Sequence, residues 1–182
     1  MPIASGNVEV TTTGSGGQAD DIRVDTRLSW SGASTLGLDD YETILVDKPV
    51  TVSGMGGLSI TTDDGGSGGY FGFDAKGHVT FASLSSALTI NGAAYTLEGN
   101  IQSLTSAIAA NYALANYYDA NNDGTYQNSP IPTEFSGAFE GLGNSISHLS
   151  PNGTGDYNSP VGLFSELSNG NQLGGRSRTS PC

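Results

Sequence analysis

The chain has few cysteines, few basic side chains and no long apolar runs. Its single cysteine is the last of 182 residues, which excludes a disulfide scaffold and zinc sites built from cysteine. Six Lys and Arg stand against 18 Asp and Glu, so the net charge is −12. No apolar run approaches the roughly 20 residues that a membrane-spanning helix needs, and we therefore predict no transmembrane segment.

The few basic residues are also scattered along the chain. Before the last seven residues they are Arg23, Arg27, Lys48 and Lys76. Their wide separation in the sequence predicts no cationic surface, and therefore no nucleic acid as a partner. The opening residues 1–6 have neither a basic stretch nor an apolar stretch, so we predict no signal peptide in this chain.

Glycine, serine, threonine and asparagine are abundant, with 27 glycines alone, and this excludes a helical bundle. From residue 7 to about residue 97 the apolar residues alternate with polar ones in short bursts. Ile44 and Val46 form one such burst, and Val50 and Val52 form the next. Alternation with a period of two is typical of strands with one buried face, so the chain is predicted to be all-β.

Strands this short bury too few side chains to build a thick core alone, which favours a parallel β-solenoid over residues 1–98. The alternative is an antiparallel β-sandwich, whose strands are joined by tight hairpin turns. Asn91-Gly92 and Asp64-Gly65 both fit such turns. Asp47-Lys48-Pro49 leaves hardly any gap between two strands, and this suits a corner between two faces of a coil.

The apolar period changes between residues 99 and 118. Ile101, Leu104, Ile108 and Tyr112 are spaced three and four residues apart, and Asn100 can cap a helix start. We therefore predict one short helix near residues 101–115. Residues 99–118 would form a helical insertion or a cap on the coils.

A candidate metal site follows in the polar loop that opens the next segment, 119–170. Asp119, Asn121 and Asp123 alternate, and Gly124 is the sixth residue of the loop. This spacing turns several oxygens toward one centre, as calcium requires. The twelfth position is Pro130 in place of the usual Glu, so calcium is a candidate cofactor and a plain turn is the alternative.

Catalytic candidates are few. The two histidines, His78 and His148, together with the acids Asp63 and Asp64, could serve a hydrolase that cleaves glycosidic or ester bonds, with or without a metal. No Gly-x-Ser-x-Gly motif accompanies them. Carbohydrate binding is a further alternative, and its candidate aromatic residues are Trp30, Tyr117, Tyr118 and Tyr126.

Residues 135–149, with the sequence FSGAFEGLGNSISHL, and the later Val161-Gly-Leu-Phe164 resemble the GLUG motif of large bacterial surface proteins. In this stretch Phe135 and Phe139 are expected on one side of a strand, the glycines at corners, and Ile146 and Leu149 in the core. Residues 88–115 are similar to the region that precedes such motifs in filamentous-haemagglutinin-like adhesins.

The resemblance implies a right-handed parallel β-helix from a secreted or surface-located protein with an adhesive role. Its partner would be a host or neighbouring-cell surface, including its carbohydrate. Residues 171–182 depart from the family pattern, and we interpret them as a tail foreign to the family and the chain as a truncated fragment. Open solenoid ends would then expose strand edges and favour a homodimer.

Overall fold

The computed structural model describes residues 6–14, 19–74, 76–105, 109–150, 152, 162–168 and 173–174. Within these residues the regular structure is nearly all β-strand. Two short 3-10 helices, η1 (Ile101–Thr105) and η2 (Ala120–Asn122), are the only helices in the described part of the chain. The prediction of an all-β protein is confirmed, and no described helix is long and apolar enough to span a membrane.

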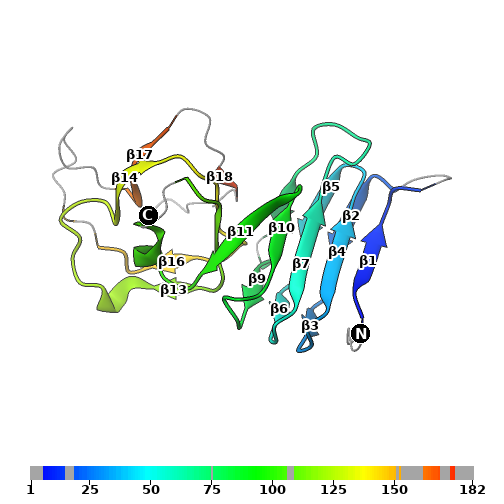
Figure 1. Cartoon of the computed structure of the whole chain (residues 1–182), viewed down its shortest axis with the longest axis horizontal. Helices are drawn as coiled ribbons and strands as arrows, with labels where there is room; N and C mark the ends of the chain where they lie inside the picture. Colours follow the sequence, from blue (N-terminus) through cyan, green and yellow to red (C-terminus); the bar gives the residue numbers. More distant parts are fainter. Residues whose placement is uncertain are drawn as a thin grey trace.

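The first part of the chain consists of three successive groups of three strands. They are β1 (Val8–Thr11), β2 (Asp21–Val24) and β3 (Leu28–Trp30); β4 (Thr35–Asp39), β5 (Thr43–Val46) and β6 (Val50–Val52); and β7 (Gly57–Thr61), β8 (Phe71–Phe73) and β9 (Val79–Phe81). Each strand pairs in parallel with its counterpart in the next group (Figure 1). This pairing gives the sheets β2-β5-β8 and β3-β6-β9, while β1-β4-β7 forms one end of an eight-stranded sheet that continues into later strands.

The pairing register stacks apolar residues on apolar residues. Ile44 lies between Ile22 and Phe71 in one sheet, and the same pattern recurs in the other two. Ile44 and Val46 are buried while Thr43 and Leu45 are half-buried, as the period of two predicts. Each group therefore supplies a thin layer of core, and the layers above and below complete its packing.

The connections between strands were predicted to be either corners between sheets or hairpin turns, and the sheet to which each strand belongs distinguishes the two. At Asp47-Lys48-Pro49 the backbone N–H groups of Asp47 and Lys48 both donate to the carbonyl of Val24, at 2.9 and 3.2 Å. Because β5 and β6 belong to different sheets, this segment is a corner, as predicted. Asp64-Gly65 is not a hairpin turn, since β7 and β8 also lie in different sheets.

A hairpin reverses the chain after the third group. β10 (Leu88–Ile90) pairs in parallel with β7 and antiparallel with β11 (Ala93–Glu98). Asn91 and Gly92 between them have φ values of 49° and 76°, which a type I′ turn requires, so this hairpin prediction is confirmed. It is the one antiparallel pair among the described strands, which rules against the antiparallel sandwich.

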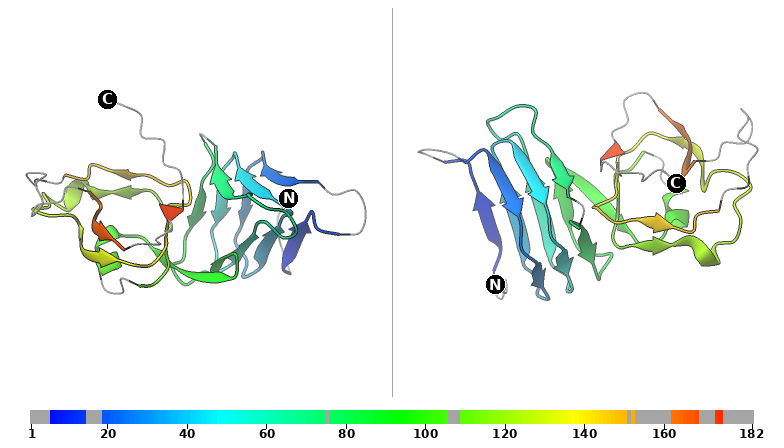
Figure 2. Two further views of the ribbon diagram at one scale, coloured as in Figure 1. Left: turned by 90° about the horizontal axis from the view of Figure 1, so that it is seen from above. Right: turned by 180° about the vertical axis from the view of Figure 1, so that it is seen from behind.

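The second part of the chain contains shorter strands that also pair in parallel. They are β12 (Tyr112–Leu114), β13 (Tyr118–Asp119), β14 (Ile131–Phe135), β15 (Phe139–Glu140), β16 (Ile146–Ser147), β17 (Phe164–Leu167) and β18 (Leu173–Gly174). The pairs are β12 with β11 and β15, β15 with β18, β13 with β16, and β14 with β17. Figure 2 shows that this part lies beside the first part, at the end away from β1.

The predicted helix over residues 101–115 was wrong. The helical segment η1 ends at Thr105, and Tyr112–Leu114 is a strand paired on both sides, with β11 and with β15. Ile101, Leu104 and Tyr112 do share one core, together with Ile131 and Phe135. Their spacing therefore reflected burial against the same cluster, and strand pairing set the backbone conformation at Tyr112. Residue 108 lies outside the described residues.

The stretch 135–149 differs in part from its expected layout. Phe135 ends β14 and Phe139 begins β15, so they do not share a strand. Both rings instead pack on Phe164, with centroids 4.9 and 5.8 Å apart. Ile146 and Leu149 are half-buried and pack against the cluster that contains Phe135, so the prediction that they lie in the core is confirmed in part.

Candidate functional site

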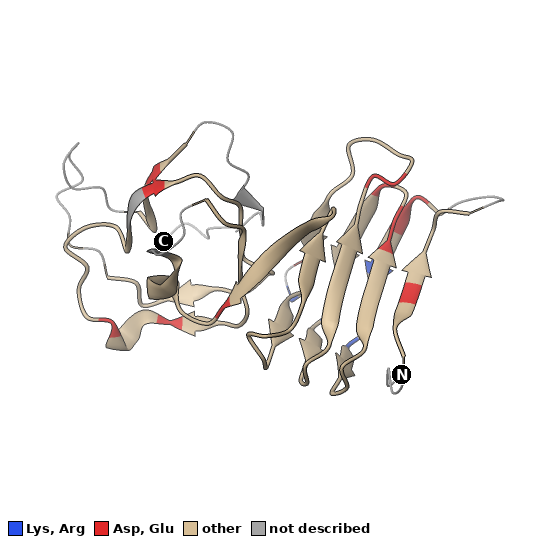
Figure 3. Ribbon diagram, in the orientation of Figure 1, with Lys and Arg blue, Asp and Glu red and all other residues tan. Residues whose placement is uncertain are grey.

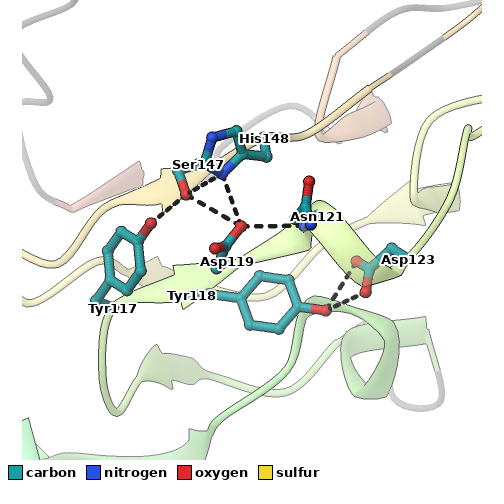
Figure 4. A network of polar contacts seen from close by, with 7 residues as sticks. All are labelled: Tyr117, Tyr118, Asp119, Asn121, Asp123, Ser147 and His148. Atoms are coloured by element: carbon teal, nitrogen blue, oxygen red, sulfur yellow. Dashed lines mark hydrogen bonds and ion pairs between the residues drawn. The ribbon is translucent and has the colours of Figure 1, made fainter.

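A network of polar side chains lies on the paired strands β13 and β16 (Figure 4). Asp119 stands opposite Ser147 in the register, so His148, the next residue, reaches the same carboxylate. The His148 Nδ1 is 2.8 Å from Asp119 Oδ1 and 3.1 Å from Ser147 Oγ. The Tyr117 hydroxyl contacts Ser147 Oγ from the other side.

Two features orient the side chains of this network, namely the backbone conformation of His148 and the ionised carboxylate of Asp119. His148 has a φ of 52°, in the left-handed region that non-glycine residues adopt at a cost of about 1 kcal/mol. The hydrogen bond from His148, followed by the backbone N–H of Asn121, lowers the pKa of Asp119. Asp119 is therefore a carboxylate near neutral pH, and it anchors the imidazole ring at the surface.

The network is not a Ser-His-Asp triad. In a triad the serine and the aspartate bind opposite nitrogens of the imidazole ring, whereas here both contact Nδ1 of His148. The His148 and Asp119 side chains are 62% and 46% exposed, so no buried pocket surrounds them. The arrangement presents hydrogen-bond donors and acceptors to solvent, which suits recognition of a polar ligand.

Asp123 takes part in a separate contact set. Its carboxylate accepts hydrogen bonds from the hydroxyls of Tyr118 at 2.8 Å and Tyr126 at 2.6 Å. Burial and the hydrogen bond to Asp123 raise the pKa of Tyr118 to about 12. The two tyrosines and the carboxylate thus tie the loop after β13 to β13 itself.

These contacts bear on the predicted calcium loop. Asp119 faces His148, Asp123 faces the two tyrosines, and the backbone N–H of Asn121 donates to Asp119 at 3.0 Å. The chain between the two acids forms the 3-10 turn η2. Across the described residues, no three histidine, cysteine or acidic side chains are grouped closely enough to hold a metal ion. Calcium binding by Asp119, Asn121 and Asp123 stays a prediction.

The acids Asp63 and Asp64 lie where the chain leaves β7, at a different corner from His78. Asp63 Oδ1 accepts a hydrogen bond from the Gly69 N–H at 2.7 Å. Asp64 lies near Asp39. Burial is the main cause of the raised pKa of Asp39, and repulsion by the Asp64 carboxylate is the second cause. The contacts of the two acids therefore lie among the stacked segments that follow β4 and β7, and among the described residues no hydrogen bond or ion pair joins them to either histidine.

A hollow of about 340 Å³ lies between the two parts of the chain. It is lined by His78, Thr80, Asn116, Tyr117, Gly143, Asn144 and Ser145. Asn144 Nδ2 donates to the carbonyls of Val79 at 2.8 Å and Leu114 at 2.9 Å, which joins the two parts. Gly143 approaches so closely that a Cβ on it would lie 2.4 Å from the carbonyl oxygen of Gly77.

Only one of the four candidate aromatic residues is available to a ligand. Trp30 is buried in the first core, and its indole N–H donates to the Ser34 carbonyl at 2.9 Å. Tyr118 and Tyr126 are half-buried and bound to Asp123. Tyr117 is 53% exposed and forms one wall of the hollow, so its ring is the one that a ligand can reach.

The structure contradicts the prediction that the scattered basic residues form no cationic surface. A second hollow, of about 510 Å³, is lined by Arg27, Lys48, Pro49, Lys76 and His78. His78 lines this hollow and the Tyr117 hollow, so the two adjoin. Sequence reasoning missed the cluster because it compared separations along the chain. The position of three of them was the available signal, because Arg27, Lys48 and Lys76 each come one to three residues before the third strand of a group.

Comparisons with known proteins identify no relative of this chain. No protein-family model, curated protein or solved structure matches this chain.

Proposed function

We propose that this chain is a segment of a right-handed parallel β-solenoid from a secreted bacterial surface protein, where it attaches the cell to carbohydrate and performs no reaction of its own. The filamentous-haemagglutinin-like resemblance of residues 135–149 motivates the surface location. The in-register pairing of three successive strand groups supports the solenoid. A rigid stack of this kind can present one ligand face along its length.

The observation that carries the carbohydrate proposal is the hollow beside Tyr117. An exposed tyrosine ring offers a flat apolar surface with a polar edge, which suits the face of a sugar ring. The neighbouring Asn116, Thr80 and Ser145 supply amide and hydroxyl groups that can bond to sugar hydroxyls. A shallow hollow with one aromatic wall and several polar groups matches the make-up expected of such a ligand site.

The test is binding of the purified chain to an array of neutral and acidic oligosaccharides. We expect at least one saccharide to bind, and Tyr117→Ala to weaken its binding by about tenfold because the stacking surface is lost. Tyr70→Ala is the matched control, since Tyr70 is 57% exposed and lies outside both hollows.

Two results would contradict carbohydrate binding in the Tyr117 hollow. An array on which no saccharide binds the chain would contradict it. Equal losses in the Tyr117→Ala and Tyr70→Ala variants would also contradict it, because the Tyr117 hollow would then have no special role.

A further inference from the structure

From the cationic hollow we infer that this face of the molecule binds an acidic oligosaccharide that carries one carboxylate on each sugar. The inference rests on the proposed function, because it names the class of saccharide that the same face takes. The cationic hollow comprises Arg27, Lys48, Pro49, Lys76 and His78, and it adjoins the Tyr117 hollow at His78.

The strand register places the basic residues in a column. Leu28, Val50 and Val79 are successive partners in the sheet β3-β6-β9. The corners that precede them are therefore stacked at the spacing of paired strands, about 4.8 Å. Arg27 belongs to the first corner and Lys48 to the second, while the third contributes Lys76 and His78. The cations thus follow one another along the stacking direction.

Among the described residues, Arg27, Lys48 and Lys76 have no ionic or side-chain partner. Arg23 is bound to Asp47 and also lies 3.6 Å from Asp74. In the described part of the chain, no ion pair or side-chain hydrogen bond involves Arg27, Lys48 or Lys76, and all three are exposed. Figure 3 shows that the basic positions of the described residues all lie on the first part of this otherwise acidic molecule.

Three neighbouring cations repel one another, and anionic groups placed between them would remove that cost. The strand spacing is comparable to the length of one sugar unit, so an oligosaccharide along the column would meet one cation with each sugar. The Arg27 guanidinium can hold a carboxylate through two parallel hydrogen bonds, and Lys48 and Lys76 act as point charges. Pro49 adds an apolar surface for a sugar ring.

Nucleic acid is the competing polyanion, and the structure disfavours it. The net charge of −12 repels a long and densely charged strand, whereas a short ligand can stay within the cationic column. The described residues offer one exposed aromatic ring beside the column, Tyr117, and single-stranded nucleic acid is usually held by several stacked rings.

The experiment is calorimetric titration of the full chain with trigalacturonic acid, and in parallel with its methyl ester, which has the same sugars without charge. We expect the acid to bind and the ester to bind at least about tenfold more weakly. Lys48→Ala should weaken binding of the acid by about tenfold, and added salt should weaken it further. Asn128→Asp is the matched control, because it changes the net charge equally on an exposed residue outside the cationic hollow.

Several results would overturn the inference. Equal binding of acid and ester would do so, as would equal losses in Lys48→Ala and Asn128→Asp. Binding of a single-stranded oligonucleotide without binding of trigalacturonic acid would assign the column to another class of ligand. If a neutral saccharide binds through Tyr117 while Lys48→Ala has no effect on trigalacturonic acid, this inference fails and the proposed function stands. If no saccharide binds, the proposed function itself fails.

Discussion

Single polar side chains hold the corners of this structure together. Asn144 donates from one amide nitrogen to two carbonyls, one in each part of the chain. Asn116 Nδ2 donates to one carbonyl, that of Phe81, at 2.7 Å. Asn91 acts as an acceptor, since the Thr62 backbone N–H donates to its Oδ1 at 2.8 Å. Buried backbone groups that leave a sheet need such partners, and asparagine provides both a donor and an acceptor.

The two hydrogen bonds that Asn144 donates stabilise the junction between the two parts of the chain. Asn144→Asp replaces the donor by a carboxylate that faces two carbonyl oxygens, so we expect the free energy of unfolding to fall by about 2–3 kcal/mol. Chemical denaturation monitored by circular dichroism measures this loss. Asn128→Asp, at an exposed position, should change stability little, and a similar loss in both variants would assign the effect to added charge alone.

At the scale of elements, close stacking of successive corners depends on glycine. A Cβ on Gly54 would lie 2.0 Å from the carbonyl oxygen of Ser31, in the corner before it. A Cβ on Gly137 would lie 1.9 Å from the carbonyl oxygen of Ala110. Because the obstructing atoms belong to the backbone, a side chain at these positions must push two corners apart.

We predict that Gly54→Ala lowers the free energy of unfolding by about 2–3 kcal/mol, as expected for forced overpacking. Gly99→Ala is the control, since a Cβ there would lie 3.8 Å from the Leu84 side chain and meet ordinary contact. Thermal unfolding of the two variants makes the comparison. An unchanged midpoint for Gly54→Ala would show that the corners do not stack as closely as described.

The elements also show what sequence patterns could and could not predict. The corner at residues 47–49 and the hairpin at Asn91-Gly92 followed from local chemistry, namely a short polar link containing proline and a turn with positive φ. The helix near 101–115 failed because a spacing of three and four residues reports a shared core and not a continuous helix. The partner strands β11 and β15 decided the conformation of Tyr112, and they are not adjacent to it in sequence.

In the molecule as a whole, burial of acidic side chains opposes their ionisation. Burial raises the pKa of Glu140, although hydrogen bonds from the Leu142 and Gly141 backbone oppose the rise. Burial and the Asp64 carboxylate raise the pKa of Asp39, one of whose oxygens is buried without a hydrogen bond. The folded state therefore favours the protonated form of both acids. The net charge of −12 adds repulsion between the ionised acids near neutral pH.

This charge distribution predicts how stability depends on pH. Because the folded state holds the protons of Asp39 and Glu140 more tightly than the unfolded state, their contribution is fully present below the ordinary pKa values of 3.8 and 4.5 and is lost as pH rises. This contribution is lost as pH rises through the raised pKa values, so we expect a higher thermal midpoint at about pH 4.5 than at about pH 8. Calorimetry at the two pH values measures the difference.

A variant separates Asp39 from the overall charge. Asp39→Asn should reduce the drop between the two pH values, because one group with a raised pKa has been removed. Asp21→Asn, at an exposed residue of β2, removes the same charge and should leave the drop nearly unchanged. Equal behaviour of the two variants would attribute the pH dependence to net charge alone.

Composition, apolar period and turn chemistry are local properties, so they were enough to predict the all-β class, the short alternating strands, the excess of acidic residues and the turn at Asn91-Gly92. Which distant residues meet depends on how the strands pair. The tertiary structure placed Asp119 beside His148 by pairing β13 with β16, buried Trp30, left Tyr117 exposed, and stacked Arg27, Lys48 and Lys76 in one column. Parallel pairing joins residues from successive groups, and separations along the chain do not reveal that register.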